Sequence, residues 1–382
     1  MSTLKKIFFL SIFIFVLSLL FWGVYNLSFK KTFVDETPKE TEAPDEIKNV
    51  VPPKETPAII AVFDEPAISP VLSADGNAIR YYSKTNGQAW EISLDGTNKK
   101  IIGDTELAGL ADVYWSADKN KVITRFNKIG EKVAFFYYNY AENKGVKLKD
   151  NLDEVAWNTN GNKILYKYYS PASQERTLNI ADPDGTSWQK LADLKYRYVN
   201  IAQIPMSGLI SFWNRPDAYT ETLLQTVPAI GGEEKTVFTG KFGADYLWNN
   251  SGTHTLVSHS DIRMGNRMQL ATINYNGGEY KNLNIPTFVS KCLWSKDQKT
   301  IYYALPGNIP ENSILPNDYD EGKFTTTDTF WKVNLENGEK TRLVETENIP
   351  GKFDVAKMFL NSDESILFFT NKIDGELYRI DL

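Results

Sequence analysis

The chain has 382 residues with a formal net charge of −6, and 13% of its residues are Tyr, Phe or Trp. An acidic chain lacks the basic stripe that the phosphates of nucleic acids require, so the composition argues against nucleic-acid binding. The single cysteine, Cys292, excludes an intrachain disulfide and a cluster of thiolate metal ligands.

An uncharged segment stands near the N-terminus. Residues 7–27, IFFLSIFIFVLSLLFWGVYNL, carry no charge. A helix of about 20 residues, rising about 1.5 Å per residue, crosses the roughly 30 Å hydrocarbon core of a bilayer. A cleaved secretory signal is the alternative, but this apolar core is longer than the usual ~7–15 residues and no Ala-x-Ala-like site follows it. The segment therefore predicts an uncleaved transmembrane signal anchor.

Positive charges flank this anchor on both sides. Lys5 and Lys6 precede it, within a tail of residues 1–6, and Lys30 and Lys31 follow it. The two lysines in front, together with the α-amino group, outnumber those behind, which favours a cytoplasmic N-terminus. We expect a single-pass protein of the bacterial cytoplasmic membrane whose remaining chain lies outside.

A polar stretch separates the anchor from the rest of the chain. Residues 28–57 are rich in Pro, Glu, Thr and Lys and contain few large apolar side chains. Such a segment cannot bury enough apolar surface to offset the entropy lost on ordering it. It predicts a disordered linker that tethers a folded domain to the membrane.

From residue 65 onward one pattern returns, consisting of an apolar run, a polar turn and a second apolar run. The residue before the turn recurs at spacings of 43, 42, 47, 44, 46 and 66, and five of these six match a four-stranded propeller blade. A second hairpin in each unit is marked by a turn such as Asp95-Gly96, whose residues tolerate positive φ. The residues before the first turns are Leu72, Trp115, Trp157, Ile204, Trp248, Trp294 and Leu360.

The seventh unit offers only three strand-like runs, VAKMFL, SILFFT and ELYRIDL. Three strands would leave an unpaired sheet edge. Residues 58–63, AIIAVF, are an apolar run with no repeat of their own, and we expect them to become the outer strand of the last blade. The sequence thus predicts an all-β fold: a seven-bladed β-propeller of four-stranded antiparallel blades over residues 58–382, preceded by one N-terminal transmembrane helix.

The units SADGNAIRYYSKTNGQAWEISLDGTNKKI and SKDQKTIYYA…DTFWKVNLENGEKTRL resemble the TolB-type, WD-like propeller repeat. In that repeat a Ser-Pro-Asp-Gly-like turn precedes an apolar strand and then an aromatic strand that ends in Asp-x-x-Gly-Gly or similar. The proline of that turn is absent here. The resemblance covers about residues 58–382. It implies a propeller with protein partners in the cell envelope.

The sequence contains no recognisable catalytic or ligand-binding motif. TolB-like propellers also precede the hydrolase domain of prolyl oligopeptidase-like enzymes, but no Gly-x-Ser-x-Gly elbow occurs. His254 and His259 would face opposite sides of a straight strand, so they would not chelate one ion. We expect no catalytic, cofactor-binding or metal-binding residues and no enzymatic activity. The alternative is a glycan-acting hydrolase or lyase that uses carboxylates from different blades around the central channel.

Repeated tryptophans occupy one position of the blade, which indicates packing between neighbouring blades rather than a ring for stacking carbohydrates. Cys292, in a predicted inner strand, is expected to pack as a small apolar residue. The tryptophans are Trp115, Trp157, Trp248 and Trp294.

One loop breaks the repeat. Residues 306–328 lengthen the sixth spacing, and long loops inside compact domains are often functional. Apolar side chains among polar ones predict a surface that binds an envelope protein or a small ligand on a monomeric propeller. The alternative is a loop that only covers one end of the channel, with NDYDEG (317–322) as a solvated acidic run. The candidate partner-binding residues are Ile314, Leu315, Tyr319, Asp320 and Phe324.

Overall fold

The computed structural model describes residues 58–127 and 133–382. The predicted tail, anchor and linker, residues 1–57, lie outside this part of the chain. Within the described residues no helix is long and apolar enough to cross a membrane. All described residues belong to one compact unit.

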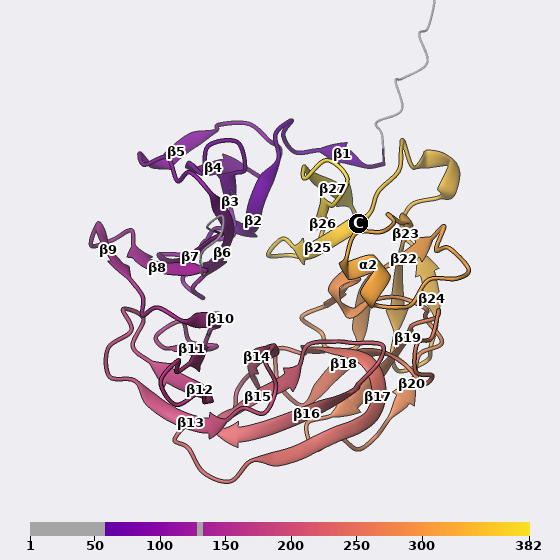
Figure 1. The fold of residues 1–382 in the computed structure, drawn as a ribbon. Coiled ribbons are helices and arrows are strands. Elements are labelled where there is room, and N and C mark those ends of the chain that lie inside the picture. The colour runs from indigo at the N-terminus through magenta and orange to yellow at the C-terminus, as the bar shows by residue number, and fades with distance from the viewer. Residues whose placement is uncertain (1–57, 128–132) are drawn as a thin grey trace, which may run out of the picture. The chain divides into compact units, whose positions relative to one another are not determined.

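The described chain is organised as antiparallel β-sheets arranged in a ring (Figure 1). Runs such as ILYKYY form strands because aromatic and β-branched side chains pack well on a pleated surface. In the first three sheets the strands follow one another in space in chain order. These sheets consist of β2 (Ala67–Leu72), β3 (Ala78–Ser83), β4 (Ala89–Ser93), β5 (Lys100–Gly103), β6 (Leu110–Trp115), β7 (Lys121–Phe126), β8 (Ala134–Asn139), β9 (Lys144–Lys147), β10 (Leu152–Trp157), β11 (Ile164–Tyr169), β12 (Arg176–Ala181) and β13 (Gln189–Asp193).

A seven-stranded sheet follows, where the sequence predicts two separate blades. The long strand β17 pairs with β16 through its first half (Lys235 with Thr226) and with β18 through its second half (Trp248 with Thr255). Gly240 and Gly243 have φ of +79° and +59°, which lets the strand bend without a loop. The strands are β14 (Val199–Gln203), β15 (Leu209–Asn214), β16 (Glu221–Pro228), β17 (Lys235–Trp248), β18 (His254–Ser260), β19 (Gln269–Asn274) and β20 (Lys281–Asn282).

The last two sheets complete the ring and carry short helical segments. In the final sheet the first strand of the described residues lies beside their last strand, in the order β1, β27, β26, β25. The elements are η1 (Val289–Lys291), β21 (Cys292–Trp294), β22 (Thr300–Gly307), α2 (Asn317–Asp320), β23 (Thr327–Asn334), β24 (Lys340–Arg342), η2 (Thr346–Asn348), β25 (Val355–Leu360), β26 (Ile366–Asn371), β27 (Leu377–Asp381) and β1 (Ile60–Ala61).

The polar turn of the repeat has a specific chemistry. Ser73 accepts a hydrogen bond from the backbone N–H of Ala78 at 3.0 Å, and Asn158 accepts one from Lys163 at 2.9 Å. A Ser or Asn at the first turn position therefore satisfies a backbone donor that the hairpin leaves unpaired. This explains why the first residue of the turn is polar in these repeats although the other turn residues vary.

The tryptophans join neighbouring sheets, as predicted. The indole N–H of Trp115 donates to the Ser69 carbonyl at 3.0 Å, and that of Trp157 donates to the Tyr114 carbonyl at 2.8 Å. Trp294 repeats this contact with the Leu247 carbonyl at 2.9 Å. These three indoles reach the innermost strand of the preceding unit, whereas Trp248 donates to the Ser211 hydroxyl of β15 at 2.9 Å. All four contacts join neighbouring units, so the packing interpretation is confirmed.

Apolar clusters between successive sheets form the core, and one of them closes the ring. Ile79 of β3 and Phe368 of β26 belong to the same buried cluster, together with Leu377 of β27. The pairing of β1 with β27, through Ile60 opposite Arg379, covers the edge of the final sheet. The two ends of the described chain therefore lie side by side (Figure 1).

Candidate functional site

One position of the repeat is occupied by a charged residue in most of the units. Three residues before each turn anchor, the innermost strands place Asp112, Glu154, Asp245 and Lys357, with Ser69 and Ile201 in two further units. In the remaining unit Lys291 takes this position at the end of η1, directly before β21. In five of the innermost strands a β-bulge or other register irregularity adjoins this position. Bulges re-aim side chains and recur next to binding and active sites. The repeat therefore builds a ring of charged side chains.

Part of this ring lines a cavity of about 570 Å³, which we call the channel site. It is bounded by the inner strands β10, β14 and β17 and by helix α2. A neighbouring cavity of about 420 Å³ shares Tyr198, Arg215 and Asp320 with it. The ionisable side chains that line the channel site are Arg125, Asp153, Glu154, Lys167, Tyr198, Arg215, Asp245 and Asp320.

Glu154 is a strongly perturbed carboxyl of the channel site. Burial raises its pKa from 4.5 to about 7, and the nearby carboxylates of Asp112 and Asp153 act in the same direction. The positive charges of Arg125 and Lys167 oppose this shift without cancelling it. A carboxyl with this pKa can exchange a proton near neutrality.

Asp245 and Asp320 extend the set of perturbed carboxyls. Burial raises the pKa of Asp245 to about 6, although its carboxylate accepts hydrogen bonds from the Trp213 indole at 2.8 Å and from Asn200 at 3.2 Å. Asp320 keeps contact with solvent, yet partial burial raises its pKa against the opposing charges of Arg215 and Lys372. The channel site thus holds three carboxyls that are easier to protonate than exposed ones.

Cations line the same space. The buried Lys167 donates to Asp153 at 2.5 Å and to the Arg197 carbonyl. The Nε atom of Arg125 is buried and finds no hydrogen-bond partner among the described residues. The channel site therefore combines carboxylates with guanidinium and ammonium groups, and the Arg125 Nε donor is unsatisfied within the described residues.

The pH dependence of stability should report on Glu154. A carboxyl whose pKa is raised in the folded state stabilises that state fully below about pH 4.5, and the contribution is lost as the pH rises through about 7. We expect wild type to lose on the order of 1–3 kcal/mol between about pH 5 and pH 8 relative to Glu154→Gln. Urea unfolding at both pH values measures this difference. Glu233→Gln, at an exposed turn, is the control and should follow wild type. Parallel behaviour of E154Q and wild type would contradict the assignment.

The 306–328 insertion folds onto the ring instead of projecting from it. Leu315 and Tyr319 are 0% and 5% exposed and pack against Met268 and Phe288, with the Phe288 and Tyr319 rings stacked at 4.6 Å. These two predicted partner-binding residues therefore offer no surface to a partner, because their apolar side chains anchor the loop. The acidic run 317–322, expected to be a solvated loop, begins with helix α2.

The remaining predicted residues stay accessible. Ile314 and Phe324 are half-buried, and Phe324 lies against Tyr319 with ring centroids 5.8 Å apart. Asp320, at the end of α2, lines the channel site. A binding role for Ile314, Asp320 and Phe324 stays a prediction, and the structure brings only Asp320 to the charged cavity.

A buried ion network holds the insertion in place. The Lys291 ammonium donates to Asp328 and to Asp354, each at 2.6 Å, and all three side chains are fully buried. The Tyr319 hydroxyl donates to Asp354 at 2.6 Å. Burial acts to raise the pKa of Asp354, but Lys291 and Tyr319 outweigh it, so this pKa lies below its ordinary value. Burial raises the pKa of Asp328 in spite of Lys291.

The histidines and the cysteine have structural partners. His259 is buried and its Nε2 lies 3.0 Å from the Tyr280 hydroxyl, whereas His254 lies at the surface beside Glu279. The buried thiol of Cys292 faces the Phe288 carbonyl at 3.4 Å, and burial raises its pKa. Among the described residues no group of three His, Cys, Asp or Glu side chains has the spacing of a metal site.

Comparisons with known proteins identify the fold class. No protein-family model matches the sequence, and no curated protein matches it. An oligogalacturonate lyase in complex with manganese superposes with a TM-score of 0.62 at 11% identity, covering 85% of this chain and 93% of that one. The β-propeller domain of the Trilobed protease from Pyrococcus furiosus gives 0.55 at 13% identity, covering 83% and 96%. TolB from Acinetobacter baumannii aligns over 56% of this chain and 54% of its own, at 15% identity and a TM-score of 0.42.

The described chain is therefore a β-propeller built from antiparallel sheets of mostly four strands. At these identities the likeness concerns the fold alone. The sequence contains the signal for the charged ring. When the repeats are aligned on their turn anchors, the ring residues occupy the same position of each repeat. The sequence did not show that Glu154 and Asp245 of this ring line one cavity together with Asp320 from the insertion.

Proposed function

We propose that this protein is a membrane-anchored, extracytoplasmic propeller of seven blades, with β17 serving two of them, and that it acts as a non-catalytic binding platform in the cell envelope. Its ligand binds at the channel site. The supporting observation is the convergence there of Glu154, Asp245, Asp320 and Arg215 from separate elements. Burying charged side chains without full pairing destabilises the folded protein. Such a cluster is therefore expected at a binding site, where a ligand supplies the missing partners.

The mixture of charges defines the ligand. Carboxylates and cations share one cavity, so a purely anionic or purely cationic molecule would meet repulsion on one wall. A small zwitterionic ligand, or a short polar segment of an envelope protein that carries both charges, satisfies both walls. Tyr198, half of whose surface is exposed at the mouth, adds an aromatic face for it.

Thermal denaturation of the full-length chain with a library of amino acids, short peptides and amino sugars tests this proposal. A true ligand at 100 times its Kd stabilises the fold by about 2.7 kcal/mol. Arg215→Ala should abolish this stabilisation. Arg267→Ala, at an exposed loop position outside the cavity, should keep it. Stabilisation that survives in R215A, or a library without any stabilising compound, would argue against the channel site.

A second candidate is a glycan-acting hydrolase or lyase. The observation that favours it is the pair of channel carboxyls Glu154 and Asp245, whose pKa values of about 7 and about 6 suit an acid and a base near neutrality. Arg125 and Arg215 could bind an acidic sugar, and an oligogalacturonate lyase shares the fold. Incubation with oligogalacturonate, followed by assays for reducing ends and for the ultraviolet absorbance of unsaturated products, decides between the candidates. If wild type forms product and E154Q does not, the protein is an enzyme and the proposal of a non-catalytic platform is wrong.

A further inference from the structure

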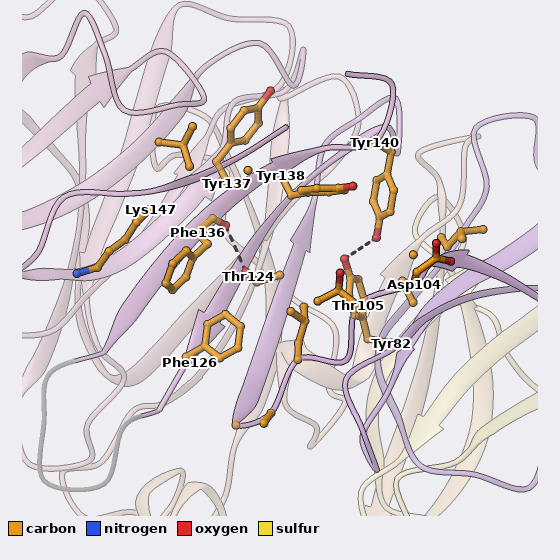
Figure 2. A pocket seen from close by; sticks show the side chains of 18 of the residues that line it. Tyr82, Asp104, Thr105, Thr124, Phe126, Phe136, Tyr137, Tyr138, Tyr140 and Lys147 are labelled. Atoms are coloured by element: carbon orange, nitrogen blue, oxygen red, sulfur yellow. Dashed lines mark hydrogen bonds between the residues drawn. The ribbon is translucent and has the colours of Figure 1, made fainter. Parts of the chain in front are cut away.

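A second cavity lies away from the channel site, between the first two sheets. It has a volume of about 960 Å³ and is lined by strands β5, β7, β8 and β9 with their connections. Figure 2 shows its aromatic wall, with Phe126 beside Phe136 and with Tyr138 next to Tyr140. Pockets of about 300–1,000 Å³ are the usual size for small-molecule sites.

The cavity lies in the outer part of this sheet interface, which the side chains of its lining do not fill. The inner part is filled by Trp115, Tyr82 and Val113, which belong to one buried cluster. Farther out the lining includes Gly103 and Gly145, where an added Cβ would come within 3.4 Å of a neighbouring side-chain atom. The short outer strands β5 and β9 thus leave open a space that bulkier residues would close.

Aromatic rings give the cavity flat apolar surfaces. Phe126 and Phe136 stand edge to face with centroids 5.4 Å apart, and Tyr138 and Tyr140 do the same at 5.0 Å. All four side chains are only half-buried. Their contacts with each other fix their orientation, so the cavity is shaped before a ligand arrives. The electron-rich faces of such rings attract the C–H groups of a flat, saturated ring.

Polar side chains at the rim of the cavity have unused hydrogen-bonding capacity. Asp104 and Thr105 lie on the wall opposite the Phe126–Phe136 pair (Figure 2), and no hydrogen bond of their side chains is found within the described residues. Asn143 accepts a hydrogen bond from the Tyr138 hydroxyl at 2.5 Å, which leaves its amide N–H groups available. A ligand that only displaced water from the aromatic wall would leave these groups unused.

The charge at the rim is balanced. Lys147 is the cation in the lining, and it already pairs with Asp150 at 2.7 Å, while Asp104 is the carboxylate. An anionic ligand would meet Asp104 without a free cation to offset it, and a cationic ligand would meet one carboxylate at an exposed position. The balance favours a neutral ligand with hydroxyl groups at its edge.

We propose that this cavity is a carbohydrate-binding site that takes a neutral pyranose unit of a short oligosaccharide. The sugar stacks one face on one ring of the Phe126–Phe136 pair, whose planes are 83° apart, and directs its hydroxyl groups to Asp104, Thr105 and Asn143. The site shares no lining residue with the channel site, so it stands apart from the function proposed there.

Saturation-transfer NMR with maltotriose, cellotriose and triacetylchitotriose tests this inference on the full-length chain. The protein is kept in a polyoxyethylene detergent, because a sugar headgroup would compete. At least one trisaccharide should receive saturation on its ring C–H protons. Phe136→Ala and Asp104→Ala should each weaken its binding tenfold or more. Tyr275→Ala, which removes a half-exposed aromatic ring elsewhere, should not weaken it.

Three results would overturn the inference: no transfer to any of the sugars, transfer that F136A and D104A both retain, or binding of indole at the cavity without binding of a sugar. Asp104 is exposed and its side chain forms no hydrogen bond or ion pair within the described residues, so D104A remains informative if F136A fails to fold.

Discussion

Deletion of residues 58–63 from the full-length chain is expected to abolish its cooperative unfolding transition. The segment supplies β1, which pairs with β27, and its Val62 N–H donates to the Leu377 carbonyl at 2.8 Å. Ile59 and Val62 are 3% and 5% exposed and lie in the clusters that join the last sheet to its neighbours. Loss of two such side chains costs roughly 4–8 kcal/mol, a large share of the ~5–15 kcal/mol that stabilises a domain.

A point variant separates this packing from the loss of the strand itself. Ile59→Ala should lower the free energy of unfolding by about 2–5 kcal/mol, measured by urea denaturation with tryptophan fluorescence. Ile101→Ala makes the same change on β5, where the side chain is 47% exposed, and should cost no more than about 0.5 kcal/mol. A deletion variant that unfolds like wild type would mean that the ring is held together without β1.

Most of this fold could be predicted from the period of the sequence repeat. Each anchor tryptophan had to contact a neighbouring unit, because an indole of this size cannot be buried within one twisted sheet, and its N–H then needed an acceptor. Three strand-like runs in the last unit pointed to a strand from elsewhere, and the observed β1 (Ile60–Ala61) lies within residues 58–63. These inferences succeeded because they depend on local periodicity and on pairing of edges.

The junction between the fourth and fifth units was not predicted. The run TVFTGKFGADYLW reads as an outer strand followed by an inner strand, and nothing in its periodicity says that no loop separates them. Gly240 and Gly243 were the available signal, since both adopt positive φ within β17. A glycine within a strand pattern indicates a bend or bulge, but it does not indicate which sheets the strand joins.

The candidate site was less readable than the fold. Tyr319 and Leu315 were expected at the surface because they stand in a polar loop, but sequence alone does not show that Phe288 and Met268 provide a pocket for them. The pKa of Glu154 is set first by its burial and then by the charges of Arg125 and Asp112, which belong to the preceding unit of the repeat. Perturbed ionisation follows from long-range packing, and only the structure supplies it.

Lys291→Met should strongly destabilise the fold. It removes the cation between Asp328 and Asp354 and leaves two fully buried carboxylates without a counter-charge. Breaking one side of a buried ion pair costs about 3–5 kcal/mol. The Oδ1 atom of Asp328 already lacks a hydrogen-bond partner among the described residues, so the network has no spare donor to take over. Urea unfolding of the full-length variant measures the loss.

Lys299→Met is the matched control. Lys299 and Glu336 form an ion pair of nearly the same length, 2.7 Å, but their side chains are 58% and 61% exposed, so its removal should cost at most about 1 kcal/mol. Equal losses in the two variants would refute the assigned role of the network. K291M should also release Tyr319 from Asp354 and loosen α2, which carries Asp320 into the channel site. The buried network positions one wall of the channel site. As the urea concentration rises, K291M should therefore lose ligand binding at that site before K299M loses it.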